Sequence, residues 1–140
     1  MAHSPAVLGG FLDLNRHAKR AKLDRRIGEL ISIAVQARLG CSRCLQAHSD
    51  AARTLGLTDD DVEMARDGSA FDPAWAAMVE FGLLAYLRPS AVNDGEVERL
   101  RALGFTDREI ADVVAVVTID VLTGTFNLVS GLSAPVPDRS

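Results

Sequence analysis

The sequence contains little of what several protein classes require. It has two cysteines, one tryptophan and one tyrosine in 140 residues, and aromatic residues make up 5% of it. Its formal net charge is −4, and the lack of a basic excess argues against nucleic acid and anionic membrane surfaces as partners. It also lacks a glycine-rich phosphate loop, an alternating strand pattern and a low-complexity linker. What remains is a globular composition with 48% hydrophobic residues, long enough to bury a core without disulfide staples.

Targeting and membrane signals are also missing. Residues 1–5 have neither the basic region nor the apolar core of a signal peptide. The most apolar run, residues 113–122, is interrupted by Asp120 and is shorter than the ~20 residues that a bilayer requires. We therefore expect a cytoplasmic protein without a membrane partner. In that reducing compartment a lone pair of closely spaced cysteines is more often redox-active or metal-binding than structural.

What the sequence does contain is helical patterning. Alanine, leucine and valine dominate, and apolar residues recur three and four positions apart. Small polar residues stand where N-caps are needed, and glycines stand where helices would end. We predict a single all-α domain over residues 1–140, with six or seven helices. The predicted helices cover residues 7–22, 25–39, 41–55, 59–65, 73–87, 94–103, and 107 to 128 or beyond.

The last predicted helix is apolar on nearly all sides. A helix of this kind is normally buried, and in so small a protein we expect a neighbouring subunit to cover part of it. Trp75 and Tyr86 are expected to pack in the core or at that interface rather than to line a pocket. The tail, residues 133–140, is expected to be a loose end.

A turn signature, Leu-Gly-x-Thr-Asp, occurs twice, beginning at Leu55 and at Leu103. In each copy the glycine stands where a helix would end, and the threonine can cap the next helix. An acidic residue three positions after the threonine completes a capping box. The two copies fit a duplicated helical hairpin, and a shared turn type explains them equally well.

The two cysteines stand in the motif Cys41-x-x-Cys44, and His48 follows four residues later. Residues three and four apart share one face of a helix, so the three side chains form a single stripe if this segment is helical. Gly40 is a natural helix stop, which places the cysteines at the start of a new helix. The free N–H groups and positive dipole end there favour a thiolate near neutral pH. The spacing allows either a disulfide or two thiolates on one metal ion.

Glu29 lies twelve residues before the first cysteine, on the preceding predicted helix. It stands between apolar positions at the edge of the core stripe, so its carboxylate needs a partner. Two interpretations are equally open from the spacing: a surface ion pair with an arginine, or a proton acceptor close to the thiols. The arginines within reach are Arg25, Arg26 and Arg38.

The pattern Glu29-x11-Cys41-x2-Cys44-x3-His48, followed by the Leu-Gly-x-Thr-Asp turn, resembles the AhpD-like branch of the carboxymuconolactone decarboxylase superfamily. The resemblance is close over residues 23–67 and looser beyond them. It implies an all-α domain assembled as a homotrimer or homohexamer. It also implies reduction of organic hydroperoxides by a cysteine pair that cycles between dithiol and disulfide.

The same resemblance implies a role for each residue of the motif. Cys44 would attack the peroxide, and Cys41 would close the disulfide and be the thiol more exposed to the reductant. Glu29 and His48 would form a proton relay. The disulfide must then be reduced by an external dithiol, such as a lipoyl or thioredoxin-like protein. We predict no cofactor and no bound metal.

The chain departs from its relatives in two places, and other functions stay open. Some relatives have a further histidine between the cysteines, and many have Phe-Asn-Arg in the last helix, where this chain has Phe-Asn-Leu at residues 126–128. The decarboxylases of the superfamily lack the cysteine pair, which argues against lactone decarboxylation. One alternative is a non-enzymatic, redox-sensing oligomeric scaffold. Another is a zinc-binding module with the ligands Glu29, Cys41, Cys44 and His48.

Overall fold

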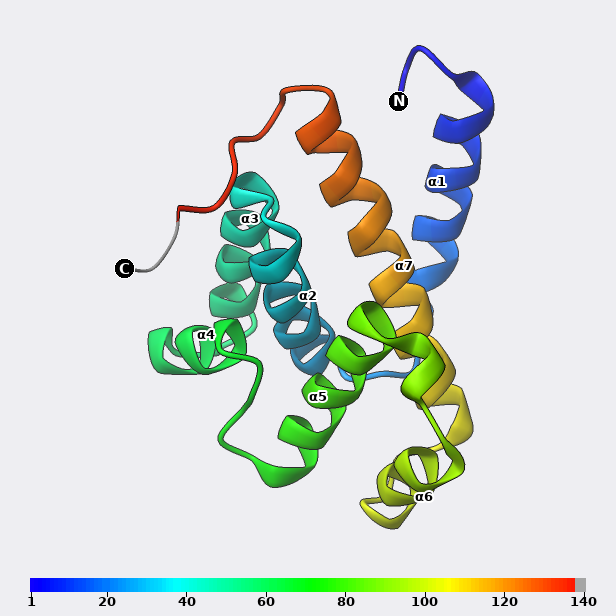
Figure 1. The fold of residues 1–140 in the computed structure, drawn as a ribbon, viewed down its shortest axis with the longest axis vertical. Coiled ribbons are helices and arrows are strands. Elements are labelled where there is room, and N and C mark those ends of the chain that lie inside the picture. Colours follow the sequence, from blue (N-terminus) through cyan, green and yellow to red (C-terminus); the bar gives the residue numbers. More distant parts are fainter. Residues whose placement is uncertain (138–140) are drawn as a thin grey trace.

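A computed structural model describes residues 1–137 as seven α-helices and one short 3-10 turn (Figure 1). Within this range there is no β-sheet, only an isolated bridge between Cys41 and Pro135. The expected all-α architecture of six or seven helices is confirmed. The elements are α1 (Pro5–Ala18), α2 (Arg25–Leu39), α3 (Ser42–Thr54), α4 (Asp59–Arg66), α5 (Pro73–Leu87), η1 (Pro89–Ala91), α6 (Asp94–Ala102) and α7 (Asp107–Val129).

The repeated turn signature ends one helix and starts the next, as predicted. Thr58 caps α4 and Thr106 caps α7. Each hydroxyl accepts the N–H of the acidic residue three positions later, and that residue's carboxylate accepts the threonine N–H. The glycine two positions before each threonine has a positive φ, 91° and 98°, which glycine adopts without a steric cost. These local signals place both helix starts correctly.

The boundaries of two helices, α1 and α3, differ from the prediction for reasons that their caps show. α1 begins at Pro5, because Ser4 caps it and proline suits the first turn of a helix, and it ends at Ala18, earlier than expected. α3 begins at Ser42 rather than Cys41, because Cys41 has extended backbone angles (φ −85°, ψ 99°) and is itself the N-cap. The cysteine motif therefore straddles the helix start.

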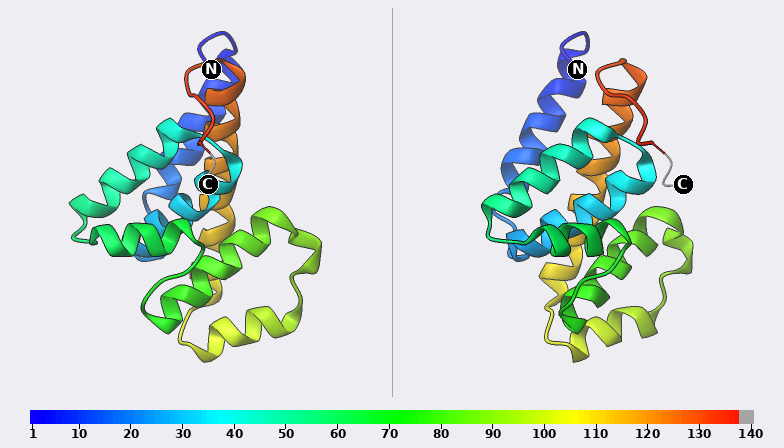
Figure 2. Two further views of the ribbon diagram at one scale, coloured as in Figure 1. Left: turned by 60° about the vertical axis from the view of Figure 1, so that its left-hand side comes forward. Right: turned by 90° about the vertical axis from the view of Figure 1, so that its left-hand side faces the viewer.

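α2 is the central helix of the fold. It packs against α3, α4, α5 and α7, while α1 lies along α7 (Figures 1 and 2). Its residues Ile31, Ile33 and Val35 have no exposed surface. A fully buried side chain of this size contributes about 1.5–3 kcal/mol relative to an exposed one. α2 is thus a fixed platform, and the side chains that it presents to α3 and α7 are held in place.

Trp75 packs against the core as expected, whereas Tyr86 both packs there and lines a pocket, which the expectation had excluded. Trp75 and Tyr86 are partly buried against the core. The Arg26 guanidinium carbon lies 4.8 Å from the centroid of the Trp75 ring, a cation–π contact. Tyr86 also lines an apolar groove of about 660 Å³ between α5 and α7.

α7 is less buried than its composition predicts. Val114 is 53% exposed and Val129 is 84% exposed in the single chain. Apolar surface of this kind is what a neighbouring subunit would cover, and the homo-oligomer stays a prediction.

By length and composition alone, α7 could also cross a membrane. It has 23 residues, and its most apolar 18-residue window has a mean hydropathy of 1.6 and is 22% buried. The helix extends beyond the expected run of residues 113–122 at both ends, so the length argument against a span was wrong. The core helix of a soluble protein passes the same test, and α7 packs against α1, α2, α5 and α6, so the feature is weak evidence for a membrane.

Candidate active site

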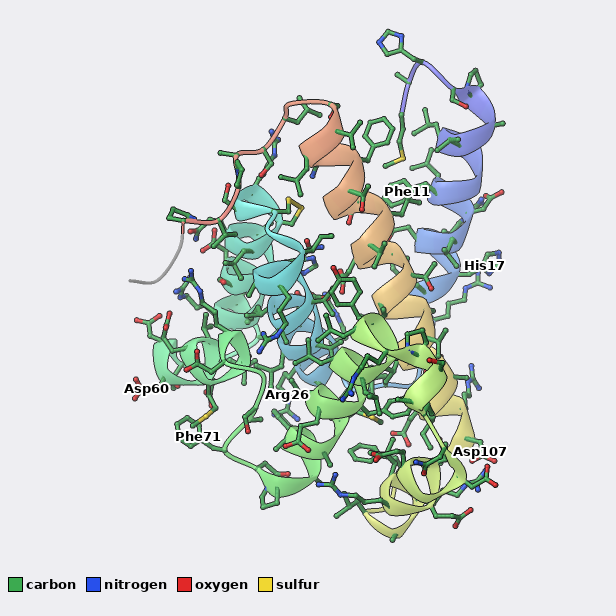
Figure 3. All side chains as sticks on the ribbon, viewed as in Figure 1. Phe11, His17, Arg26, Asp60, Phe71 and Asp107 are labelled. Atoms are coloured by element: carbon green, nitrogen blue, oxygen red, sulfur yellow. A yellow bond between two sulfur atoms is a disulfide. The ribbon has the colours of Figure 1, made fainter. Side chains whose placement is uncertain are left out.

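The cysteine pair lies at the N-terminus of α3. Cys41 and Cys44 form a disulfide, with 5.3 Å between their Cα atoms, and Figure 3 shows it as a yellow bond between α3 and α7. The Cys44 N–H points at the Cys41 sulfur, with an N–S distance of 3.3 Å. The Cys41 sulfur therefore lies at the N-cap position, and the Cys44 sulfur lies in the first turn of the helix. Both are close to the positive end of the helix dipole.

Both cysteines are buried, which corrects one expectation. Cys41 is 0% exposed and Cys44 is 6% exposed, so Cys41 is not the more accessible of the two in this structure. The cause is the C-terminal segment, which folds back over the start of α3.

The segment that covers Cys41 is residues 133–136. The Ser133 hydroxyl accepts the Arg43 N–H at 3.1 Å and lies 3.5 Å from the Cys41 sulfur. The Ser42 hydroxyl donates to the Ala134 carbonyl at 2.8 Å. The expectation of a loose tail is wrong for residues 133–136, and residues 138–140 lie outside the described part of the chain.

Asn127 of α7 contacts the second sulfur. Its side-chain Nδ2 donates to the Cys44 sulfur at 3.3 Å. We assigned no role to this residue from the sequence. The only signal was a carboxamide in an otherwise apolar helix, at the position where relatives have Phe-Asn-Arg.

The structure brings Glu29 and His48 together. Glu29 lies on α2 and His48 on α3, and the Glu29 Oε2 is 2.7 Å from the His48 Nδ1. The alternative of an arginine partner receives no support: Arg26 is bonded to Asp24, and Arg38 donates to main-chain carbonyls. Glu29 is therefore part of the site rather than of a surface ion pair.

A second carboxylate, Asp120 of α7, lies on the other side of the imidazole. Its Oδ1 is 3.4 Å from the His48 Nε2, and the residue is 2% exposed. From the sequence we read Asp120 only as an interruption of an apolar run. An acidic residue in such a run needs a partner inside the fold, and that was the signal that could have identified it.

These contacts shift the pKa values of both groups. Burial alone would lower the pKa of His48, but the hydrogen bond to Glu29 and the charges of Asp120 and Glu29 outweigh it, so the His48 pKa is raised. Burial raises the pKa of Asp120 to about 6, although the positive charge of His48 acts in the opposite direction. His48 therefore favours its charged form more than a free imidazole does. It lies beside a carboxyl group whose own pKa is raised by burial.

A pocket of about 440 Å³ opens onto this carboxylate–histidine cluster between α1, α2 and α7. Glu29, His48 and Asp120 line it, and neither cysteine does. No group of three or more His, Cys, Asp or Glu side chains within residues 1–137 is arranged to hold a metal ion. The zinc alternative therefore gains no support from the arrangement.

The fold and the site define a class: an all-helical domain with a cysteine pair at a helix start, beside a carboxylate–histidine pair from the two packed helices. The chain belongs to the carboxymuconolactone decarboxylase family, whose model matches residues 5–89, more than half of the chain. Its fold is AhpD-like. No curated protein matches the sequence.

Several solved structures share this fold, including the three that follow. An alkylhydroperoxidase AhpD core protein from Ralstonia eutropha, described as peroxidase-related, has a TM-score of 0.85 at 24% identity. The match covers 96% of this chain and 73% of that protein. A peroxidase-related protein from a Silicibacter species has a TM-score of 0.81 at 23% identity. The match covers 91% of this chain and 69% of that protein. An Agrobacterium tumefaciens protein, described as a candidate AhpD antioxidant defence protein, has a TM-score of 0.80 at 20% identity. The match covers 97% of this chain and 95% of that protein. At these identities the likeness establishes the fold alone.

Proposed function

We propose that this protein is a thiol-dependent peroxidase that reduces organic hydroperoxides through Cys41 and Cys44. The observation that carries the proposal is the disulfide at the start of α3, with the Cys44 sulfur held by Asn127. Family membership and the peroxidase-related descriptions of two structural neighbours agree with it. The active form would be the reduced dithiol.

The proposed reaction balances with these two sulfurs and one external reductant. The Cys44 thiolate attacks a peroxide oxygen, an S–O bond forms as the O–O bond breaks, and the alkoxide leaves as an alcohol after it takes a proton. The Cys41 thiol then attacks the sulfenic acid on Cys44, the disulfide forms, and water leaves. An external dithiol of the lipoyl or thioredoxin-like class supplies the two electrons that restore both thiols.

Proton transfer would fall to the Glu29–His48 pair. The hydrogen bond to Glu29 raises the pKa of His48 and so favours the protonated ring, which could donate to the leaving alkoxide and later recover a proton. Among the hydrogen bonds of residues 1–137, none joins His48 to a sulfur. The relay would therefore reach the sulfur through the hydroperoxide oxygen or through a water molecule.

The covered sulfur matters for the reducing step. A protein dithiol that attacks Cys41 would first have to displace residues 133–136, because they leave that residue without exposed surface.

We also propose the cytoplasm as the setting, since a reducing compartment supplies such dithiols. We propose in addition that the protein forms a homotrimer or homohexamer, in which a neighbouring subunit covers the exposed face of α7.

Reaction with one equivalent of an organic hydroperoxide tests the proposal directly. We expect the reduced protein to lose both thiols rapidly, with a mass decrease of about two hydrogens, as an intramolecular disulfide requires. The measurement is thiol titration with intact mass, and protein alkylated beforehand at both cysteines is the control. Thiols that persist would overturn the proposal. Oxidation without turnover on any dithiol reductant would instead favour a redox-sensing scaffold.

Replacing Asn127 by the isosteric leucine should slow the reaction of Cys44. A hydrogen bond to a charged group is worth about 1.5–3 kcal/mol, so losing the Asn127 donor should lower the rate of Cys44 alkylation near pH 7 by about ten-fold or more. The rate is measured with iodoacetamide in a Cys41→Ser background, as a function of pH. Gln46→Leu, which removes an amide from the exposed face of α3, is the control and should leave the rate unchanged. If Cys44 were alkylated at the same rate in Asn127→Leu as in Gln46→Leu, Asn127 would have no part in activating the Cys44 thiol.

A further inference from the structure

Asp120 is a buried carboxylate that the proton relay described so far does not use. Within residues 1–137 it is the only charged side chain in the buried set. α7 presents it to the interior, where the Gln36 amide donates to its main-chain carbonyl at 3.0 Å. Its Oδ1 faces the His48 ring, while its Oδ2 has no hydrogen-bond partner among the described residues. Burying such a group is costly unless it has a task or a partner.

Asp120 and Glu29 hold His48 from opposite sides. Glu29 meets the Nδ1 at 2.7 Å and Asp120 meets the Nε2 at 3.4 Å. An imidazole donates from both nitrogens only when it is protonated, so two carboxylate partners favour the charged ring and fix its orientation. The three side chains come from α2, α3 and α7, and only the packing of these helices brings them together.

We propose that Asp120 is a positioning residue for the peroxidase reaction, which holds a proton on His48 and sets the plane of its ring. The inference rests on the proposed function, because it assigns His48 the task of giving that proton to the leaving alkoxide. Asp120 acts through His48 and does not touch the sulfurs. The family motif contains the glutamate and the histidine, and the structure places a second carboxylate, from α7, against the same imidazole ring.

The groups that face Asp120 support this role. Glu29 and His48 are the titratable side chains against it, and Ser32 and Gln36 of α2 are its neutral polar neighbours. Lys19 and Arg25 lie farther out, at the lining of the pocket. Because the Asp120 pKa is raised to about 6, mainly by burial, a carboxyl that exchanges its proton near neutral pH sits next to the histidine.

The pocket gives this cluster its own access to solvent. Its walls include Val116 and Ile119 of α7 as well as the cluster itself, and no cysteine lines it. Water in the pocket can therefore exchange protons with the cluster without passing the cysteines. Glu29 holds the Nδ1 at 2.7 Å and Asp120 faces the Nε2 at the longer distance of 3.4 Å. The hydroperoxide oxygen or a water molecule would therefore take the place of the Asp120 contact at the Nε2 when His48 gives up its proton.

Asp120→Asn tests the inference through the pKa of His48. The asparagine has the same shape and removes only the charge, so we expect the His48 pKa to fall. The titration is followed by ¹⁵N-edited NMR of the imidazole. The sequence has three histidines, of which His3 and His17 are exposed, and a His48→Gln variant assigns the third. An unchanged His48 pKa would overturn the inference.

A matched control and a kinetic readout separate positioning from a merely structural effect. Asp107→Asn removes a carboxylate from the exposed first turn of the same helix, and it should leave the His48 pKa unchanged. In Asp120→Asn the alkaline limb of the kcat profile should move to lower pH, and kcat at pH 8 should fall about ten-fold or more with little change in KM. A uniform loss at every pH would contradict the inference. If the asparagine variant does not fold, the smaller Asp120→Ser carries the same test.

The two measurements also separate this inference from the proposed function. If the wild-type protein consumes no hydroperoxide, the proposed function fails, and the NMR titration alone shows whether Asp120 holds the proton. If the wild-type protein is active while Asp120→Asn keeps both the His48 pKa and the pH profile, the inference fails alone.

Discussion

Cys44→Ser should abolish hydroperoxide consumption, and Cys41→Ser should reduce it to a single round. Serine at position 44 leaves no thiolate to attack the peroxide, so consumption should fall to the level of buffer with reductant. Serine at position 41 leaves the attacking thiolate in place but removes the thiol that condenses with the sulfenic acid. That variant should consume about one equivalent and then stop.

Intact mass and peroxide consumption distinguish the two variants. Cys41→Ser should gain the mass of one oxygen on Cys44 and react with a sulfenic-acid probe such as dimedone, whereas Cys44→Ser should do neither. The double serine variant gives the background. Reversed behaviour, with the oxygen on Cys41, would exchange the roles of the two cysteines. Full activity in Cys44→Ser would end the peroxidase assignment.

We expect Gly124→Val to destabilise the protein. Gly124 lies on the face of α7 that crosses α2. A Cβ atom there would lie 2.6 Å from the Gln36 Oε1 and closer still to a methyl of Leu39. Both neighbours are on the central helix. Gln36 is fully buried and Leu39 partly buried, so both side chains would have to move to admit the new one. Overpacking of this kind lowers the free energy of unfolding by about 1–3 kcal/mol. Because valine adds more than a single Cβ atom, we expect a loss at or above the upper end of that range, which corresponds to a fall in Tm of roughly 10 °C.

Gly28→Ala is the matched control for this steric prediction. Gly28 is also a helical glycine, on α2, and a Cβ atom there meets nothing within 4 Å. Alanine is the better helix former by about 0.5–1 kcal/mol, so this variant should be unchanged or slightly more stable. Thermal and urea unfolding measure both. A Gly124→Val protein as stable as the wild type would mean that α7 and α2 do not approach as closely as described.

Local sequence signals were sufficient for most of the fold. Seven helices, both capping boxes and the start of α2 after its N-cap Asp24 follow from residues within a few positions of each boundary. The cysteine motif and its place at a helix start also follow locally, because Gly40 ends α2. The missed detail, Cys41 as the N-cap instead of the first helical residue, depends on one pair of backbone angles.

The sequence by itself thus determined the helices, the family resemblance and the pairing candidates Glu29 and His48, because period and spacing are local properties of the chain. Only the tertiary structure decided which residues of α7 and the tail reach the site. Asn127 meets Cys44, Asp120 meets His48, and residues 133–136 cover Cys41. These partners lie far apart in the sequence, and no local pattern encodes their distances. The crossing of α2, α3 and α7, set by how their apolar faces pack, brings them together.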